Sequence, residues 1–406
     1  MGDRLENNNN LIAKCPYFGN CGGCSAQHIP YELQLANSQK ILSTLLKVEK
    51  DSIEIFSDSA YNYRNRMDFI VHAGGLGLRK KGQWNKIVDI ESCSIAMPKV
   101  NELLCEVREF LLGLSDGIDY FDLEKQTGSM KYCVIRCTKL GNSSVSFCLN
   151  QDSSTLKGAI ETVKLYAAQS SAANVIISYQ PKEKDQSISL EYFVCKGSDM
   201  LFEKLDDWKY YYSVQGFFQN NPVMAEKMVL YVKNIFSKYT DTKNSQLLDL
   251  YGGVGTFGVA LADLFEKVYV MELFAPSIEI ANKNIYVNAL SNVTAHVGDV
   301  KQFRAKLSKL ISQEGNKQFR KLGFDANQKT YVLVDPPRSG IVPKALQRLI
   351  ELEPPVIVYI SCNPKQLAKD LVKLRSKGYV VKSCALFDLF PQTPHMEAVV
   401  ELVMVE

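Results

Sequence analysis

The sequence lacks any apolar run approaching the ~18 residues that a membrane-spanning helix needs, which argues against an integral membrane protein. Its first ten residues are polar and include four consecutive asparagines, so they do not resemble a secretory signal peptide. The net charge is only +3, from 47 basic and 44 acidic residues, and is too small to indicate a nucleic-acid partner by itself. We therefore expect a cytoplasmic monomer that has no membrane association.

A disulfide framework is also excluded. The chain has eleven cysteines, an odd number, and without a secretion signal this favours reduced thiols or metal ligation. Three of them, Cys15, Cys21 and Cys24, lie in a glycine-rich C-x5-C-x2-C loop, where thiolates would repel one another unless a cation held them. This spacing predicts zinc or an iron–sulfur cluster. The candidates for a fourth ligand are Cys93, Cys105, Cys133 and Cys137. Cys93, in a turn after a strand, is the best of them.

The length of 406 residues predicts two to three domains, at ~100–200 residues each. Residues 1–14 are expected to be disordered, and apolar spacing predicts a helix over 27–50. From about 53 to 200 the apolar runs become short and β-like, with Gly, Asn and Pro between them. We predict a β-rich domain over 15–210 and an α/β domain over 211–406, with the helix over 27–50 packing on the α/β domain.

Three stretches concentrate positive charge. Residues 61–66 and 77–84 combine cations with aromatic side chains, a mixture that suits phosphate contacts and base stacking. A solvated hairpin face explains these two stretches equally well. Residues 301–321 hold seven Lys or Arg against one acid, and form either a surface insertion that meets phosphates or a solvated helix face.

A glycine turn follows the predicted strand Leu247–Leu250. Gly252, Gly253 and Gly255 let the backbone approach a ligand closely, and a helical pattern follows them, as a nucleotide-binding fold requires. No lysine follows the turn, which argues against a P-loop. The next strand ends at Glu272, where an acid accepts hydrogen bonds from ribose hydroxyls. The turn therefore predicts an adenosine-containing cofactor, either a dinucleotide or S-adenosylmethionine.

Two later strands end at polar turns. Proline stops the first at Asp335-Pro-Pro, because it cannot donate to a sheet ladder, and the second stops at Ser361-Cys362-Asn363-Pro364. Ligands of open α/β sheets bind at the carboxyl ends of strands, so an acid and a cysteine are expected at one edge. Cys362 is either catalytic or a buried packing residue. Glu397, at the start of the last strand, either caps a loop or, if it lies near Cys362, is a candidate base.

Together these motifs resemble the uracil-C5 RNA methyltransferases, which make 5-methyluridine in ribosomal or transfer RNA from S-adenosylmethionine. The resemblance covers nearly the whole chain from Cys15. Its motifs are Phe217-Phe218-Gln219-x-Asn221, the cofactor loop from Asp249 to Gly255, Asp335-Pro-Pro-Arg338, Ser361-Cys-Asn-Pro364 and Pro394-His-Met-Glu397.

The resemblance implies a doubly wound, Rossmann-like methyltransferase domain after a β-rich RNA-binding domain. It implies that the Cys362 thiolate adds to C6 of the uracil, which activates C5, and that Glu397 later removes the C5 proton. The target uridine must be flipped or single-stranded. The implied cofactor shell is Gln219, Tyr251, Thr256, Glu272, Asp299 and Asp335, with Glu272 on the ribose and Asp299 near the adenine.

The resemblance also assigns Cys15, Cys21, Cys24 and Cys93 to a [4Fe–4S] cluster, as in the members that act on ribosomal RNA. We therefore expect 23S ribosomal RNA as the substrate and transfer RNA as the alternative. The cluster is expected to shape the RNA-binding domain rather than to transfer electrons. Longer ribosomal members carry an N-terminal OB-like domain, and we expect this chain to be of the shorter type without it.

Three other functions are weighed. A cytosine-C5 RNA methyltransferase also uses a cysteine at C6, but usually has an acid beside that cysteine. An NAD-dependent oxidoreductase fits the glycine turn but leaves Cys362, Glu397 and the four cysteines unexplained. A non-catalytic iron–sulfur RNA-binding factor fits only the N-terminal half.

Overall fold

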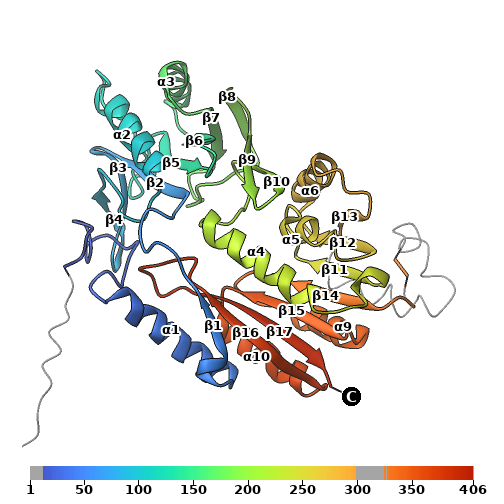
Figure 1. Cartoon of the computed structure of the whole chain (residues 1–406). Coiled ribbons are helices and arrows are strands. Elements are labelled where there is room, and N and C mark those ends of the chain that lie inside the picture. The colour runs from blue at the N-terminus through green and yellow to red at the C-terminus, as the bar shows by residue number, and fades with distance from the viewer. Residues whose placement is uncertain (1–11, 299–323, 326, 406) are drawn as a thin grey trace, which may run out of the picture.

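The computed structural model describes residues 12–298, 324–325 and 327–405 (Figure 1). Asp299, the basic stretch 301–321 and most of the N-terminal stretch expected to be disordered lie outside these residues. Within the described part of the chain, no helix is both long enough and apolar enough to cross a membrane.

The first sheet has seven strands in the order β4-β3-β2-β5-β6-β7-β8, and only β6 and β7 are parallel. Its strands are β2 (Arg66–His72), β3 (Gly75–Lys80), β4 (Gln83–Asp89), β5 (Met130–Cys137), β6 (Ser143–Asn150), β7 (Asn174–Gln180) and β8 (Tyr192–Lys196). Helices α2 (Pro98–Leu112) and α3 (Leu156–Gln169) pack on one face. The alternation along β2 explains this face, because Met67, Phe69 and Val71 are buried in the core shared with α2.

The second sheet has eight strands in the order β1-β16-β17-β15-β14-β11-β12-β13. They are β1 (Ile53–Phe56), β11 (Gln246–Leu250), β12 (Lys267–Glu272), β13 (Val293–Val297), β14 (Thr330–Val334), β15 (Val356–Ser361), β16 (Tyr379–Phe387) and β17 (Glu397–Met404). Short 3-10 turns precede β1 (Lys50–Ser52) and β11 (Thr242–Asn244).

Helices cover both faces of this second sheet. They are α4 (Pro222–Ser237), α5 (Thr256–Ala260), α6 (Ala275–Val287), α9 (Pro343–Leu352), α10 (Pro364–Arg375) and α1 (Tyr31–Leu46). Every residue of β14 is buried, yet Leu333 belongs to the core under α4 and α5 while Val332 and Val334 belong to the core under α9 and α10. A continuous apolar strand is typical of a sheet buried on both sides. The α/β fold predicted for this part of the chain is confirmed.

The N-terminal segment before the first sheet contributes to the second. Strand β1 pairs in parallel with β16, and α1 lies beside α10 (Figure 1). The guanidinium of Arg375 on α10 donates to the carbonyl of Leu46, the last residue of α1, at 2.6 Å. The division of the chain at about residue 211 stays a prediction.

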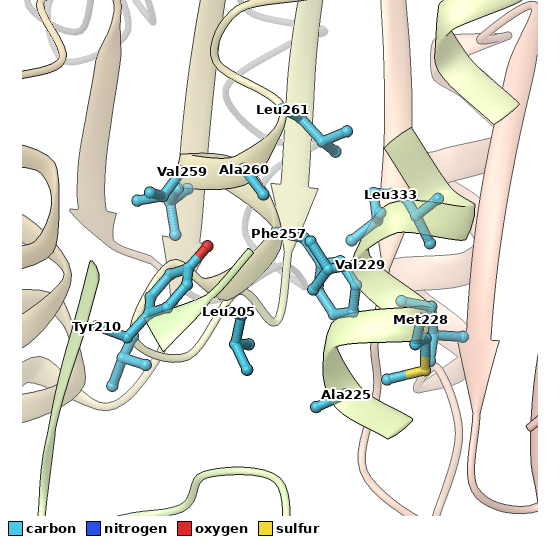
Figure 2. Close-up of a cluster of buried hydrophobic side chains, with 14 of the residues drawn as sticks. Leu205, Tyr210, Ala225, Met228, Val229, Phe257, Val259, Ala260, Leu261 and Leu333 are labelled. Atoms are coloured by element: carbon cyan, nitrogen blue, oxygen red, sulfur yellow. The ribbon is translucent and has the colours of Figure 1, made fainter. Parts of the chain in front are cut away.

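A hairpin of β9 (Met200–Leu205) and β10 (Trp208–Ser213) joins the two parts. Figure 2 shows its Leu205 and Tyr210 beside side chains of α4 and α5, with which they share one buried core. The Tyr210 hydroxyl donates to the carbonyl of Thr256 at 2.8 Å. The hairpin therefore supports the short helix that follows the glycine turn.

Leu205→Ala should lower the free energy of unfolding by about 2–5 kcal/mol, because it removes a side chain with no exposed surface and leaves a cavity between hairpin and helix. Urea unfolding followed by circular dichroism measures this. The control is Leu165→Ala on α3, where the leucine is 65% exposed and the expected change is within about 0.5 kcal/mol. Equal effects of the two changes would contradict the packing described.

Candidate active site

The predicted site residues lie along one edge of the second sheet. Glu272 ends β12, Tyr251 and Asp335 directly follow the neighbouring strands β11 and β14, and Cys362 directly follows β15. These four strands are parallel, so their carboxyl ends meet at this edge. Glu397 begins β17, which is antiparallel to β15, so its start lies at the same edge. Strand order reverses between β11 and β14, which is the switch point where open α/β sheets bind ligands.

Cys362 and Glu397 are brought together by the register of their strands. Ser361 of β15 pairs with Ala398 of β17, so the next residue on one strand faces the preceding residue on the other. Glu397 is buried, and Cys362 is half-buried. Glu397 is therefore placed to act on the same substrate as Cys362, rather than only to cap a loop.

The surroundings of Cys362 and Glu397 disfavour a negative charge on either side chain. Burial, and then the negative charges of Glu397 and Asp335, raise the pKa of the Cys362 thiol to about 11. Burial and the charge of Asp335 also raise the pKa of Glu397 well above its usual range. Arg338 works against both shifts. Both shifts disfavour the charged forms in the free protein, and a bound cation would favour them.

The nucleophile turn is tied to the acidic turn. Asn363 caps helix α10 by accepting from the amide of Gln366 at 3.4 Å, and Pro364 occupies the first helical position, where its missing N–H costs nothing. The side-chain amide of Asn363 donates to the carbonyl of Arg338 at 2.8 Å. The cysteine and Asp335 are thus held in a fixed relation by one asparagine.

The glycine turn is tight in the way that the sequence predicts. Gly253 and Gly255 have φ of 52° and 82°, and a Cβ on Gly252 would lie 2.6 Å from a methyl of Val270. The amide of Gly253 lies 3.3 Å from one oxygen of Glu272, whose other oxygen accepts from the amide of Phe274 at 2.9 Å. Glu272 is therefore oriented by the backbone on both sides of the cofactor turn.

Asp249 is a site residue whose role sequence reasoning missed. It is fully buried on β11, and one carboxylate oxygen accepts from the amide of Gly258 at 2.9 Å, while the other has no hydrogen-bond partner among the described residues. Burial, and the charges of Asp335 and Glu272, raise the pKa of Asp249 to about 8, although the Gly258 amide opposes this. Burial raises the pKa of Asp335 to about 7.

Three carboxyl groups thus surround the turn. Such a site suits the positively charged sulfonium of S-adenosylmethionine better than the anionic pyrophosphate of a dinucleotide. These acids therefore distinguish between the two cofactors that the glycine turn left open. Glu272 and Asp335 stand at strand ends identified from the sequence, whereas Asp249 lies within β11.

Gln219 and Thr256 come from segments beside the strand edge. Gln219 is half-buried in the loop between β10 and α4, and its backbone carbonyl accepts from the side-chain amide of Asn65 at 3.3 Å. Thr256 is the first residue of α5. Nearby, Phe217 is 72% exposed and lines a cavity of about 670 Å³ together with Val254 of the glycine turn.

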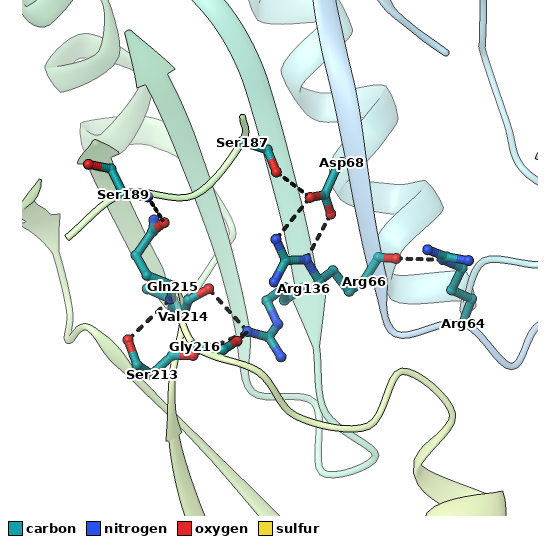
Figure 3. A network of polar contacts seen from close by, with 10 residues as sticks. All are labelled: Arg64, Arg66, Asp68, Arg136, Ser187, Ser189, Ser213, Val214, Gln215 and Gly216. Carbon is teal, nitrogen blue, oxygen red and sulfur yellow. Dashed lines mark hydrogen bonds and ion pairs between the residues drawn. The ribbon is translucent and has the colours of Figure 1, made fainter. Parts of the chain in front are cut away.

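Arg136 holds the loop before Gln219, and no sequence signal identified it. It lies on β5 of the first sheet with 1% of its surface exposed. One of its terminal nitrogens donates to the carbonyls of Ser213, Val214 and Gly216 at 3.1, 3.1 and 2.7 Å (Figure 3). The first sheet therefore positions part of the site on the second.

The predicted metal-binding cysteines line one cavity of about 160 Å³. Cys93 joins Cys15, Cys21 and Cys24 there, whereas Cys133 and Cys137 are buried in β5 and Cys105 is exposed on α2. The amide of Gly23 donates to the sulfur of Cys21 at 3.3 Å. Among the described residues, however, no three His, Cys, Asp or Glu side chains are arranged to hold one metal ion, so the expected iron–sulfur site is not shown.

Comparison with known proteins decides the family. The model of the tRNA (uracil-5-)-methyltransferase family matches residues 30–405. This chain belongs to that family. A tRNA (uracil(54)-C(5))-methyltransferase of Pyrococcus horikoshii is 32% identical over 393 residues, 97% of this chain and 86% of that protein. An uncharacterised RNA methyltransferase of Caldanaerobacter subterraneus is 32% identical over 95% of this chain and 83% of its own length.

The fold agrees with a solved relative. The crystal structure of Pyrococcus abyssi tRNA (uracil-54, C5)-methyltransferase in complex with S-adenosyl-L-homocysteine matches with a TM-score of 0.74 and 29% identity, and the match covers 94% of this chain and 86% of that one. The predicted enzyme class is confirmed: the chain is an S-adenosylmethionine-dependent RNA uracil-C5 methyltransferase. The oxidoreductase and the non-catalytic factor are set aside.

Alkylation of Cys362 should report the charge of the site. In the free protein its rate with iodoacetamide should rise about tenfold per pH unit without a plateau below about pH 10, because the thiol pKa is about 11. S-adenosylmethionine should increase the rate at neutral pH about tenfold over S-adenosylhomocysteine, because a nearby positive charge lowers a thiol pKa by about one unit or more.

Peptide mapping by mass spectrometry follows the single cysteine, and exposed Cys105 in the same digest is the internal reference. Equal rates with the two ligands would argue against electrostatic coupling between the cofactor turn and Cys362.

Proposed function

We propose that the protein methylates C5 of a uridine in transfer RNA, at the position numbered 54 in the names of its relatives. The support is the pair Cys362 and Glu397, set side by side at the strand edge next to the acidic turn. Transfer RNA is preferred to 23S ribosomal RNA because the relatives named above by substrate act on uracil 54 of tRNA. The ribosomal expectation depended on the cysteine pattern alone.

The residues account for the chemistry in order. C5 of uracil is a weak nucleophile, so Cys362 first loses its thiol proton to solvent. The thiolate sulfur then forms a bond to C6 and the displaced electron pair passes to the ring, which makes C5 nucleophilic. S-adenosylmethionine supplies the methyl group that C5 takes. Glu397 then removes the proton from C5, and the electrons of that C–H bond expel the Cys362 thiolate from C6. The products are 5-methyluridine and S-adenosylhomocysteine.

The acids at the strand ends are assigned to the cofactor. Asp249, Glu272 and Asp335 line the cofactor turn in this proposal, with Glu272 on the ribose, and the positive charge of the cofactor favours their ionised forms. Tyr251, Thr256 and Gln219 complete the shell in this proposal, as the family resemblance implies. The uridine must leave its stack to reach Cys362, which follows a buried strand.

Tritiated S-adenosylmethionine and an unmodified tRNA transcript test the function. The wild-type protein should place label as 5-methyluridine at one position, and Cys362→Ala should abolish it while RNA binding persists. Glu397→Gln should accumulate a covalent protein–RNA adduct in denaturing gels, because the C5 proton cannot leave. Label in 23S RNA with none in tRNA would reverse the substrate assignment, and label in neither would refute the function.

We also propose that Cys15, Cys21, Cys24 and Cys93 hold a [4Fe–4S] cluster. Four thiols around one cavity support this, since a cluster of four irons takes sulfur ligands that are spaced further apart than those of a single ion. The backbone around Cys93 supports it too. Burial raises the pKa of the Cys93 thiol, but the backbone amides of Ile95 and Ala96 lower it, because they donate hydrogen bonds that favour the thiolate.

The proposed role of the cluster is structural, and it extends to the catalytic loop. The amides of Ser25 and Ala26, directly after Cys24, donate to the carbonyl of Gln392 at 2.9 and 3.1 Å. The side-chain N–H of Gln34 donates to the side-chain oxygen Oε1 of Gln392 at 3.0 Å. Gln392 lies five residues before Glu397. An ordered cysteine loop would therefore hold in place, through these hydrogen bonds, the segment that leads to Glu397.

Cys93→Ala should therefore lose iron, measured by chelator assay, and should show faster hydrogen exchange over residues 388–396. Cys105→Ala is the matched control, since Cys105 is exposed and does not line the cavity. Retention of iron by Cys93→Ala at the wild-type level would overturn the ligand set, and unchanged exchange in an iron-free variant would overturn the structural role.

A further inference from the structure

A groove of about 510 Å³ lies on the β3–β4 hairpin, on the open face of the first sheet. Asp68 and Ile70 of β2 line it, whereas Met67, Phe69 and Val71 of the same strand point into the core under α2. Because side chains alternate along a strand, the groove lies on the face opposite the helices. The proposed function does not use this surface.

The groove carries an aromatic platform. Trp84 is 66% exposed, and the guanidinium of Arg79 lies over its ring, 5.8 Å from the centroid. Arg79 is fixed by Asp185 at 2.7 Å and by the carbonyl of Trp84 itself. A large exposed indole with an ordered cation beside it is the arrangement on which nucleic-acid bases stack.

The groove is also positively charged. Lys80 and Lys81 line it at the hairpin turn, beside Arg79. The one acid of its lining, Asp68, is neutralised by Arg66 at 2.8 Å and accepts from the hydroxyl of Ser187 at 2.5 Å. This charge favours a polyanion over an apolar protein segment.

The cysteine loop forms one wall of the groove. The amide of Gly22 donates to the carbonyl of Arg79 at 2.9 Å, and the amide of Lys81 donates to the carbonyl of Asn20 at 2.8 Å. A Cβ on Gly22 would lie 3.2 Å from the carbonyl oxygen of Arg79, so the loop and the hairpin approach each other closely here. Gly23 lines both this groove and the cysteine cavity.

We propose that this groove binds an unpaired stretch of the substrate RNA outside the active site. One base stacks on Trp84, and Lys80 and Lys81 hold the adjacent phosphates. The inference depends on the proposed RNA substrate and adds a second contact region to it. Of the two interpretations of residues 77–84, a binding site and a solvated hairpin, this proposal adopts binding.

Tryptophan fluorescence tests the stacking directly. The chain has two tryptophans, so Trp208→Phe leaves Trp84 as the only reporter. Titration with single-stranded oligouridylate should quench its emission in a saturable way. The affinity for this oligonucleotide should fall as the salt concentration rises. A titration that leaves the emission unchanged at RNA concentrations that saturate binding would overturn the proposal.

Three variants in the wild-type background measure affinity for the tRNA transcript. Trp84→Ala should bind about tenfold more weakly, within the range for loss of one stacked base, and Trp84→Phe should recover most of that loss. The double change Lys80→Ala with Lys81→Ala should flatten the plot of log K against log salt by about 1.4, at about 0.7 per phosphate. The KM for RNA should rise in parallel.

The matched control is Lys157→Ala with Lys164→Ala, two exposed lysines on α3, which covers the opposite face. This pair should change neither affinity nor salt slope. If the wild-type protein methylates tRNA but the groove variants bind it normally, the groove proposal fails and the function stands. If oligouridylate quenches Trp84 but no RNA is methylated, the function fails and the binding surface stands.

Discussion

The antiparallel pairing of β17 between β15 and β16 is the constraint on which the catalytic arrangement depends. A strand that entered this position in parallel would place Glu397 at the far edge of the sheet, a full strand length from Cys362. Because β17 runs against β15, the start of one strand and the end of the other meet. The proposed base and nucleophile are thus set by backbone register, which costs no side-chain ordering at the moment of reaction.

The same edge of the sheet concentrates buried carboxyl groups, which raises the free-energy cost of ionising them. Asp249, Asp335 and Glu397 are each held by burial with a raised pKa, so the free site resists gaining negative charge. A cationic cofactor relieves that resistance. A bound cation is therefore expected to favour ionisation of the Cys362 thiol, whose pKa burial raises to about 11 in the free protein.

Much of this edge was predictable, because strand ends carry local signals. Prolines after Asp335 and Cys362 and glycines after Tyr251 mark where strands stop, and parallel strands place those stops together. Arg136 and Asp249 carry no such signal, since their roles come from contacts made by folding: an arginine in a β-run and an acid in a strand look ordinary in sequence. The addition of β1 to the second sheet was missed for the same reason. The proposed preference for transfer RNA comes from the relatives, because the cysteine spacing does not encode the substrate.

The cysteine loop connects what the two sheets do. At its end, the amides of Ser25 and Ala26 donate to the carbonyl of Gln392, five residues before the proposed base Glu397. In its middle, the amide of Gly22 donates to the carbonyl of Arg79 on the hairpin that carries Trp84. A rigid loop would therefore fix the distance between the proposed RNA contact and the active site. A flexible loop would leave each site intact but would let the distance between them vary. Metal binding suits this task, because it restricts a glycine-rich segment that buries too little apolar surface to order itself.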